Sequence, residues 1–299
     1  MQETKSVSMF KIAVFIQNAG RRGEWNYVIR TGVASNPRCR IVDDVDSADI
    51  ILCNDEVSKF FICDPKKRIS IDYKDDSHEY SKQKSLLYFK RSTIHKIDGQ
   101  FHSKLPSMFI PIPYPIKSFY CYNIDDNIKK DIDVSILFAC HQGNTHKWRT
   151  LVTKCIRDHP KLASLKKQVG PIGPCKSEGR NNYIDGYWKT LRRSKIVVTC
   201  SPSSWEGDSR LVEAISSNTL VFSDRLYAEY THPFRDKVHC IFYDLLKLND
   251  LVDNIVTYLK PENENTRLQI AENGYKHAME FYKPSDIIDQ IIDKYMSTK

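Results

Sequence analysis

The stretch 194–225 constrains the fold most, because its pattern predicts a strand, a loop, a helix and a second strand. Residues 195–200 form a short β-branched run, which is typical of a buried strand. Residues 201–207 consist mainly of Ser, Pro and Gly, the residues that favour turns. An apolar helix face follows, and residues 220–222 begin the next strand. A unit of this kind predicts an α/β fold with a parallel sheet.

The loop and the start of this predicted helix offer a binding site for an anion. Backbone N–H groups near Gly207 and a helix capped by Asp208 or Ser209 converge on one point, which suits a phosphate. Arg210 adds a guanidinium there, and Glu213 lies one helical turn further on the same face. A carboxylate at that place could hold ribose hydroxyls, so these five residues predict a nucleotide-diphosphate site. The alternative is an ordinary strand–helix–strand unit in which Arg210 and Glu213 form a solvated pair.

The segment Ser-Arg-Leu-Val-Glu-Ala at 209–214 lies between a Ser-Pro-rich loop and a Val-Phe-Ser-Asp strand. In this context it resembles the donor-binding segment of exostosin-type glycosyltransferases. The wider resemblance is to nucleotide-sugar enzymes of the GT-B architecture, and it covers residues 133–236 well but the N-terminal half by topology only. It implies two Rossmann-like α/β domains that face each other across a cleft. Eukaryotic exostosins carry membrane anchors and longer domains, so the chain is more similar to compact, anchorless members in bacteria and large algal DNA viruses.

The chain of 299 residues is long enough for two domains, each with its own core. Short apolar runs predict strands of a first α/β domain, residues 1–117, at 10–17, 38–42, 50–53, 68–72 and 86–89. Three prolines at alternate positions predict an extended linker over 110–115. Residues 118–283 form the predicted second domain. Residues 284–299 form a last amphipathic helix, which the resemblance places against the N-terminal domain.

A second predicted strand–loop–helix junction carries basic residues at 141–149. Arg149 lies on the first turn of the predicted helix, beside a loop that contains Gly143 and Asn144. The resemblance implies a basic residue against the donor diphosphate in this region, and we expect Arg149 to take that role, with Lys147 as the second choice. Alternatively, Arg149 is an ordinary surface residue on an exposed helix turn.

A transferase that inverts the anomeric centre needs a side chain that accepts the proton of the acceptor hydroxyl. That base is expected from the N-terminal domain, across the cleft from the donor. We predict Asp72 first, because it closes the strand 68–72, and Asp75 second. The other candidates at strand ends are Asp55, Glu56, Asp76 and His78. Each of these residues could equally be a solvated loop side chain.

The resemblance implies an inverting glycosyltransferase that moves a sugar from a UDP-sugar to a hydroxyl of an oligosaccharide or glycoprotein glycan. UDP-xylose and a β-linkage are the first expectation. Two alternatives remain: a retaining transferase, which needs no such base, and an epimerase-like or regulatory protein that binds a UDP-sugar without transfer. A net charge of +8 also suggests a nucleic-acid binder, but Lys and Arg are spread along the chain, so we expect no nucleic acid.

We expect no metal ion and no other cofactor, and the UDP-sugar is counted as a substrate. Two Asp-x-Asp strings, at 44–46 and 131–133, have the pattern that binds divalent cations in another glycosyltransferase class. Neither ends a buried strand as such a pair should, because 44–46 lies in a predicted turn before a helix and 131–133 precedes a predicted strand. We also expect a cytoplasmic protein without a membrane span. No apolar run reaches spanning length, the N-terminus lacks a signal-peptide pattern, and nine scattered cysteines include no C-x-x-C pair.

Overall fold

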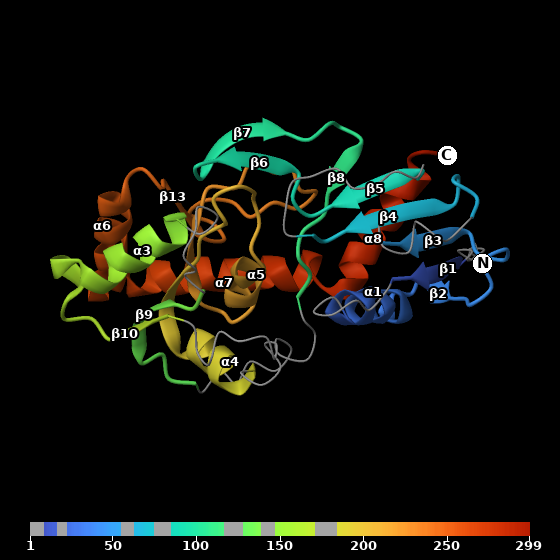
Figure 1. Ribbon diagram of the computed structural model, residues 1–299. Coiled ribbons are helices and arrows are strands. Elements are labelled where there is room, and N and C mark those ends of the chain that lie inside the picture. The colour runs from blue at the N-terminus through green and yellow to red at the C-terminus, as the bar shows by residue number, and fades with distance from the viewer. Residues whose placement is uncertain are drawn as a thin grey trace.

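The computed structural model has two lobes, each built around a parallel β-sheet (Figure 1). The structure describes residues 9–16, 23–54, 63–74, 85–116, 128–138, 147–170 and 184–299. We call the described residues 9–116, with the C-terminal helix, the N-lobe, and residues 128–283 the C-lobe. Two such lobes agree with the predicted fold class.

The N-lobe sheet has the strand order β2-β1-β3-β4-β5-β8, and every neighbouring pair is parallel. Its strands are β1 (Phe10–Phe15), β2 (Cys39–Ile41), β3 (Ile50–Cys53), β4 (Arg68–Asp72), β5 (Leu87–Lys90) and β8 (Phe109–Pro111). The central strands β3, β4 and β5 are buried along their whole length. Continuous burial explains why their sequences show apolar runs instead of alternation.

The predicted linker over 110–115 is wrong at its start. Phe109–Pro111 form β8, which pairs with β5 in parallel, and the N–H of Ile112 donates to the carbonyl of Lys90. Proline cannot donate to a sheet ladder, so it is confined to edges, and β8 is the last strand of this sheet. The edge position therefore accommodates Pro111 in a strand, and the extended backbone predicted for this segment is confirmed there.

The C-lobe sheet has the order β10-β9-β11-β12-β13, again parallel throughout. Its strands are β9 (Ile132–Ile136), β10 (Lys167–Val169), β11 (Ser194–Val198), β12 (Leu220–Asp224) and β13 (Ile241–Tyr243). The helices α3 (Lys147–Asp158) and α6 (Leu248–Leu259) share one core cluster with this sheet. The helices α4 (Ile184–Arg193) and α5 (Ser209–Ile215) share another, and α7 (Glu264–Phe281) contributes to both.

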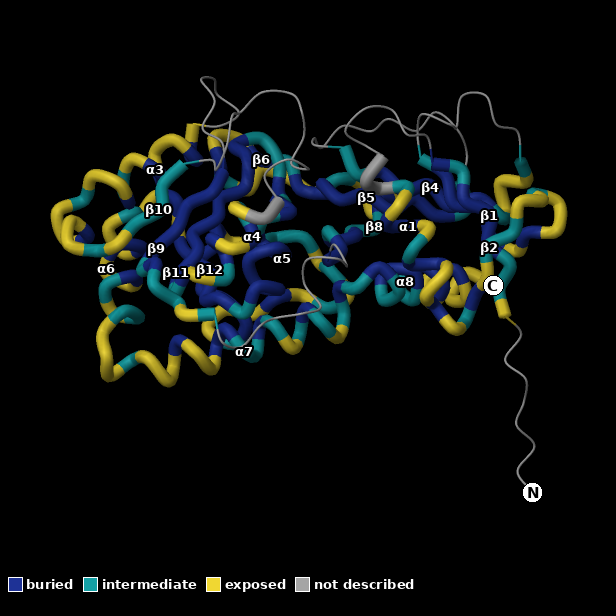
Figure 2. The backbone as a smooth tube through the Cα atoms, turned by 90° about the horizontal axis from the view of Figure 1, so that it is seen from below, coloured by how far each residue is buried: buried dark blue, intermediate teal, exposed yellow. Residues whose placement is uncertain are grey.

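The C-terminal helix returns to the N-lobe, as predicted. After α7, helix α8 (Pro284–Met296) runs beside α1 (Gly23–Ser35), and the C-terminus lies in the N-lobe (Figures 1 and 2). Four isoleucines on one face of α8 are fully buried in the N-lobe core: Ile287, Ile288, Ile291 and Ile292. Gly32 allows the close approach of the two helices, because a Cβ there would lie 2.5 Å from the carbonyl oxygen of Pro284.

A β-hairpin that the sequence analysis did not anticipate joins the lobes. Strands β6 (Ile94–Ile97) and β7 (Gln100–Lys104) are antiparallel, with Asp98 and Gly99 at the turn. Both turn residues have positive φ, 50° and 79°, which is the geometry that an Asp-Gly hairpin turn favours. The hairpin extends from the N-lobe across the C-lobe (Figure 1), where His95 forms an antiparallel bridge with Trp205.

Candidate functional site

The candidate site lies where the C-lobe strands β9, β11 and β12 end. In open parallel sheets, ligands bind outside the carboxyl ends of the strands. The loop 201–207, between β11 and α5, lies at this edge. It contacts the N-lobe hairpin, because Trp205 of the loop forms a β-bridge with His95. Gly207 has a φ of +106°, a conformation that favours glycine, and its N–H donates to the hydroxyl of Ser201.

Two guanidinium groups converge on one carboxylate at the start of α5. Arg149 donates from Nη2 to Oδ2 of Asp208 at 2.9 Å, and Arg210 donates from Nη1 to Oδ1 of the same residue at 3.0 Å. Asp208 also caps α5 by accepting the N–H of Arg210. We call Arg149, Asp208 and Arg210 the Arg–Asp cluster. With two cations for one anion, the cluster has an excess positive charge that suits an anionic ligand.

The structure brings the two predicted strand–loop–helix units together at this cluster. Arg149 comes from α3 and Arg210 from α5, although they are separated by 61 positions in the sequence. Arg149 is only 6% exposed, and its Nε donates to the carbonyl of Cys200. The alternative of an ordinary surface arginine is therefore wrong.

Glu213 is also buried, and its Oε2 accepts a hydrogen bond of 2.6 Å from the hydroxyl of Tyr187 on α4. The burial contradicts the alternative of a solvated helix pair with Arg210. Ser209 is buried in the first turn of α5. Lys147 lies apart from the cluster, since its ammonium contacts both carboxylate oxygens of Asp98 on the hairpin at 2.9 Å. Lys147 therefore joins the lobes instead of adding charge to the cluster.

Asp72 lies in a different environment from the one that a general base requires. Its Oδ2 is 2.6 Å from the ammonium of Lys90, and the two side chains are 1% and 0% exposed. Oδ2 also accepts the hydroxyl of Tyr88, and Oδ1 accepts the N–H of Lys74. The strand end thus fixes Asp72 as predicted, but in an internal ion pair that an acceptor hydroxyl does not reach. Five other candidates lie outside the described residues: Asp55, Glu56, Asp75, Asp76 and His78.

The two Asp-x-Asp strings are engaged by cations or by the backbone. Asp131 pairs with Arg193 and Lys166, and the hydrogen bonds to Arg193 in particular lower its pKa. Asp133 pairs with Lys195 at 2.7 Å, while Asp44 accepts the N–H groups of a turn. Within the described part of the chain, no group of three or more His, Cys, Asp or Glu side chains could hold a metal ion.

Three charged residues of the site were missed by the sequence analysis. Lys96 of β6 places its ammonium 2.7 Å from Oδ2 of Asp224 at the end of β12, and both side chains are at most 2% exposed. Glu206 in the loop accepts the N–H groups of Tyr227 and Ala228 at 2.5 and 2.9 Å. Burial raises the pKa of Glu206 to about 7, against the lowering effect of Lys96. The Asp-Gly turn signal at 98–99 could have indicated the hairpin that carries Lys96.

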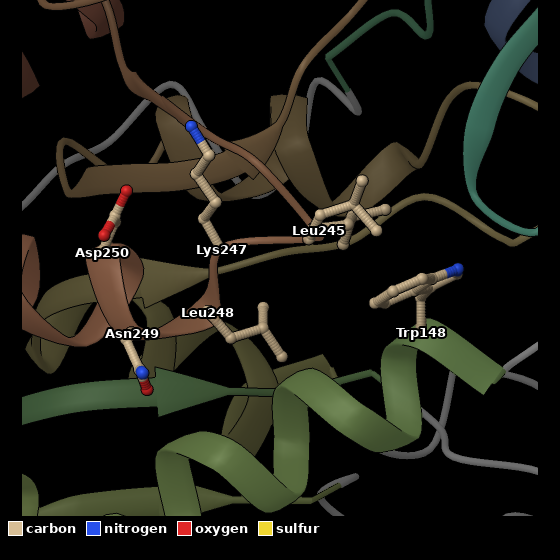
Figure 3. A pocket seen from close by; sticks show the side chains of 7 residues that line it. Trp148, Leu245, Lys247, Leu248, Asn249 and Asp250 are labelled. Carbon is tan, nitrogen blue, oxygen red and sulfur yellow. The ribbon is translucent and has the colours of Figure 1, made fainter.

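A pocket lies at the start of α3 and α6 (Figure 3). Trp148, Leu245 and Leu248 form its apolar wall, and the other lining residues are Leu246, Lys247, Asn249 and Asp250. The indole N–H of Trp148 donates to the carbonyl of Asp98, so the hairpin tip borders this pocket.

Among the described helices, none is long and apolar enough to cross a membrane.

The sequence profile of a family described as glycosyl transferase-like matches residues 164–293, most of the C-lobe and part of α8. No curated protein sequence matches the chain. An alpha-glucosyltransferase in complex with UDP and a mismatched DNA 13-mer superimposes with a TM-score of 0.59 at 10% identity, covering 96% of this chain and 99% of that chain.

Two further solved structures are similar over nearly the whole chain. Anabaena HepE in complex with UDP and glucose has a TM-score of 0.58 at 11% identity, covering 96% of this chain and 100% of that chain. Sucrose-phosphate synthase from Thermosynechococcus elongatus has a TM-score of 0.55 at 12% identity, with 97% and 99% covered. TarM is longer, and the match spans 57% of its length. These likenesses show that the chain has the GT-B fold.

Proposed function

We propose that this chain is a glycosyltransferase that takes its sugar from a UDP-sugar bound to the C-lobe. The Arg–Asp cluster carries this proposal. It places two guanidinium groups at the strand ends of a GT-B domain, with the carboxylate of Glu213 further along the same short helix. A nucleoside diphosphate offers the two groups that such a site recognises, a diphosphate and a ribose.

The diphosphate is assigned to Arg149 and Arg210. As the sugar leaves, negative charge grows on the diphosphate, and charge-assisted hydrogen bonds from the guanidinium groups would stabilise it. In the described structure these donors bind the carboxylate of Asp208. A diphosphate carries more charge and more acceptor oxygens than one carboxylate, so it would take over some of these donors. The guanidinium groups can stabilise the departing diphosphate in place of a divalent metal ion. We therefore expect sugar transfer to continue in the presence of EDTA.

The ribose is assigned to Glu213. Its carboxylate already accepts the hydroxyl of Tyr187, which fixes its direction, and a second oxygen can accept ribose hydroxyls. The presence of UDP in the structures of HepE and the alpha-glucosyltransferase, which share the fold, supports uracil as the base. UDP-xylose remains the first donor to be tried, and the hydroxyl of an oligosaccharide or glycoprotein glycan the first acceptor.

The stereochemical course has two candidates. The inverting mechanism needs a carboxylate or imidazole that reaches the acceptor, and Asp75 and the other strand-end candidates lie outside the described residues. The internal ion pair between Asp72 and Lys90 favours the retaining alternative, because it takes away the first candidate for the base. The anomeric configuration of the product decides between the two mechanisms.

The experiment is a thermal-shift screen of nucleotides and nucleotide sugars, followed by product analysis with the donor that stabilises the protein. A ligand that binds the folded state raises the midpoint of unfolding. We expect UDP and at least one UDP-sugar to stabilise the chain, and NMR of the product to show the sugar on a glycan. Stabilisation without transfer to any glycan would favour a UDP-sugar-binding or epimerase-like protein. No stabilisation by any uridine nucleotide would contradict the proposal.

A further inference from the structure

We propose that Lys96 is a positioning residue for the donor site, and that the N-lobe segment 91–99 holds the C-lobe loop 201–207 in its binding conformation. This inference rests on the proposed function, since it concerns the loop that leads into the Arg–Asp cluster. All residues predicted to bind the donor belong to the C-terminal half. The loop that leads into α5 is nevertheless held by the other lobe.

Backbone and side-chain hydrogen bonds run from the N-lobe segment to successive residues of the loop. The N–H groups of Lys96 and Gly99 donate to the carbonyls of Ser204 and Ser203 at 2.9 and 2.8 Å. Nearer the helix, the hydroxyl of Ser92 donates to the carbonyl of Glu206 at 3.2 Å. Nη1 of Arg91 donates to the carbonyl of Gly207 at 3.3 Å. With the bridge between His95 and Trp205, the segment contacts five consecutive residues of the loop, 203–207.

The side chain of Lys96 adds a contact to the start of the loop. Its ammonium donates to Oδ2 of Asp224, and Oδ1 of Asp224 accepts the N–H of Ser201 at 2.7 Å. The hydroxyl of Ser201 in turn accepts the N–H of Gly207, the residue that precedes Asp208. A chain of hydrogen bonds therefore connects the N-lobe hairpin to the residue before the Arg–Asp cluster.

Burial makes this connection costly to lose. The buried ammonium of Lys96 pairs with Asp224, and the buried carboxylate of Glu206 also acts on it electrostatically. Removing one partner from a buried ion pair leaves an uncompensated charge, which is far more disruptive than replacing both partners. The hydrogen-bonded geometry of Asp224, and with it the position of Ser201, depends on Lys96.

The test compares UDP affinity in the full-length Lys96→Met and Lys104→Met variants. Lys104 is a matched control, because it lies on the same hairpin and pairs with Glu229 on the surface. Calorimetry is done at a temperature at which circular dichroism shows each variant to be folded. We expect Lys96→Met to weaken UDP binding by about tenfold or more, and Lys104→Met to leave it unchanged. Hydrogen exchange should rise in peptides covering 201–207 in Lys96→Met only.

A second variant covers the case in which Lys96→Met does not fold. Lys96→Met combined with Asp224→Asn removes both charges of the ion pair, and the amide oxygen of residue 224 can still accept the N–H of Ser201. We expect this double variant to fold but to bind UDP as weakly as the single variant, because the side-chain contact between residue 96 of the hairpin and residue 224 is missing. UDP affinity equal to that of the wild type in the folded single or double variant would overturn the inference.

The failure of the inference and the failure of the proposed function give different results. If the wild type binds no UDP, the proposed function fails. The hydrogen-exchange measurement then tests by itself whether Lys96 holds the loop 201–207 in place. Unchanged exchange over 201–207 in the Lys96 variants would then overturn the positioning role. Faster exchange in these variants, with the Lys104 control unchanged, would support it.

Discussion

The hydroxyl of Tyr187 lies 2.6 Å from Oε2 of Glu213, and this hydrogen bond joins α4 to the helix that begins at the Arg–Asp cluster. It fixes the direction of the carboxylate that we assign to the ribose. Glu213→Gln should weaken UDP and UMP binding by similar factors, because both ligands carry the ribose. A neutral amide replaces a charged acceptor, so a loss of about 1.5–3 kcal/mol is expected, roughly 10- to 150-fold in the dissociation constant.

The control for Glu213→Gln is Tyr187→Phe, which removes the hydroxyl but keeps the carboxylate. It should cost less, about 0.5–1.5 kcal/mol of binding free energy, as is typical of a neutral hydrogen bond. Calorimetry with both nucleotides measures the two effects. A Glu213→Gln variant that loses UDP affinity but binds UMP normally would place Glu213 at the diphosphate instead.

Arg149→Ala should behave differently from Glu213→Gln. Its guanidinium is assigned to the diphosphate, so UDP affinity should fall by roughly 10- to 150-fold while UMP affinity falls much less. Arg149→Lys keeps the charge but loses the two-pronged geometry, and it should recover only part of the loss. Arg157→Ala is the matched control, since Arg157 lies on the same helix and pairs on the surface with Asp158. Equal losses for UMP and UDP would contradict the assignment.

Asp72→Asn should lower stability. Asp72 and Lys90 form a buried ion pair, and removing the charge of one partner typically costs 3–5 kcal/mol; retained hydrogen bonding in Asn places the expected loss at about 3 kcal/mol. Urea unfolding measures the loss in the free energy of unfolding. Combining Asp72→Asn with Lys90→Met should recover much of it, because no unpaired charge is left. A large loss of turnover at unchanged stability would instead return Asp72 to the role of the general base.

The C-lobe was predictable because its local patterns are strong. The β-branched runs, the turn residues of 201–207 and the apolar face of α5 specify β11, α5 and β12 without tertiary information. The apolar face of α8 likewise predicts a helix that packs this face against the rest of the protein. The apolar runs at Ile50–Cys53 and Arg68–Asp72 similarly predict buried strands of the N-lobe.

The contacts between the lobes could not be predicted in the same way. Lys96, Glu206 and Asp224 are residue types usually found at the surface. Lys96 and Asp224 are buried as an ion pair between the lobes, and Glu206 is buried with its carboxylate bonded to two backbone N–H groups. Asp72 shows the same limit, because its position at a strand end was predicted but its pairing with Lys90 on the neighbouring strand was not. Sequence patterns indicate which elements form, whereas these ion pairs depend on how the elements meet.

Glu206 should make stability fall as the pH rises. Burial raises its pKa from the ordinary value of 4.5 to about 7, so the folded state binds the proton more tightly than the unfolded state. The resulting stabilisation is complete below pH 4.5 and is lost as the pH rises through 7, by on the order of 3 kcal/mol. In Glu206→Gln this decline should be absent. Urea unfolding of both proteins at pH 4.5 and pH 8 measures it, and parallel pH profiles would contradict the raised pKa.

The structure of the chain with bound UDP tests the central claim most directly. We predict that the diphosphate lies within hydrogen-bond distance of Arg149 and Arg210, that the carboxylate of Glu213 contacts the ribose hydroxyls, and that segment 91–99 keeps its contacts with the loop. UDP bound away from the ends of β9, β11 and β12, or a diphosphate that touches neither arginine, would contradict the account.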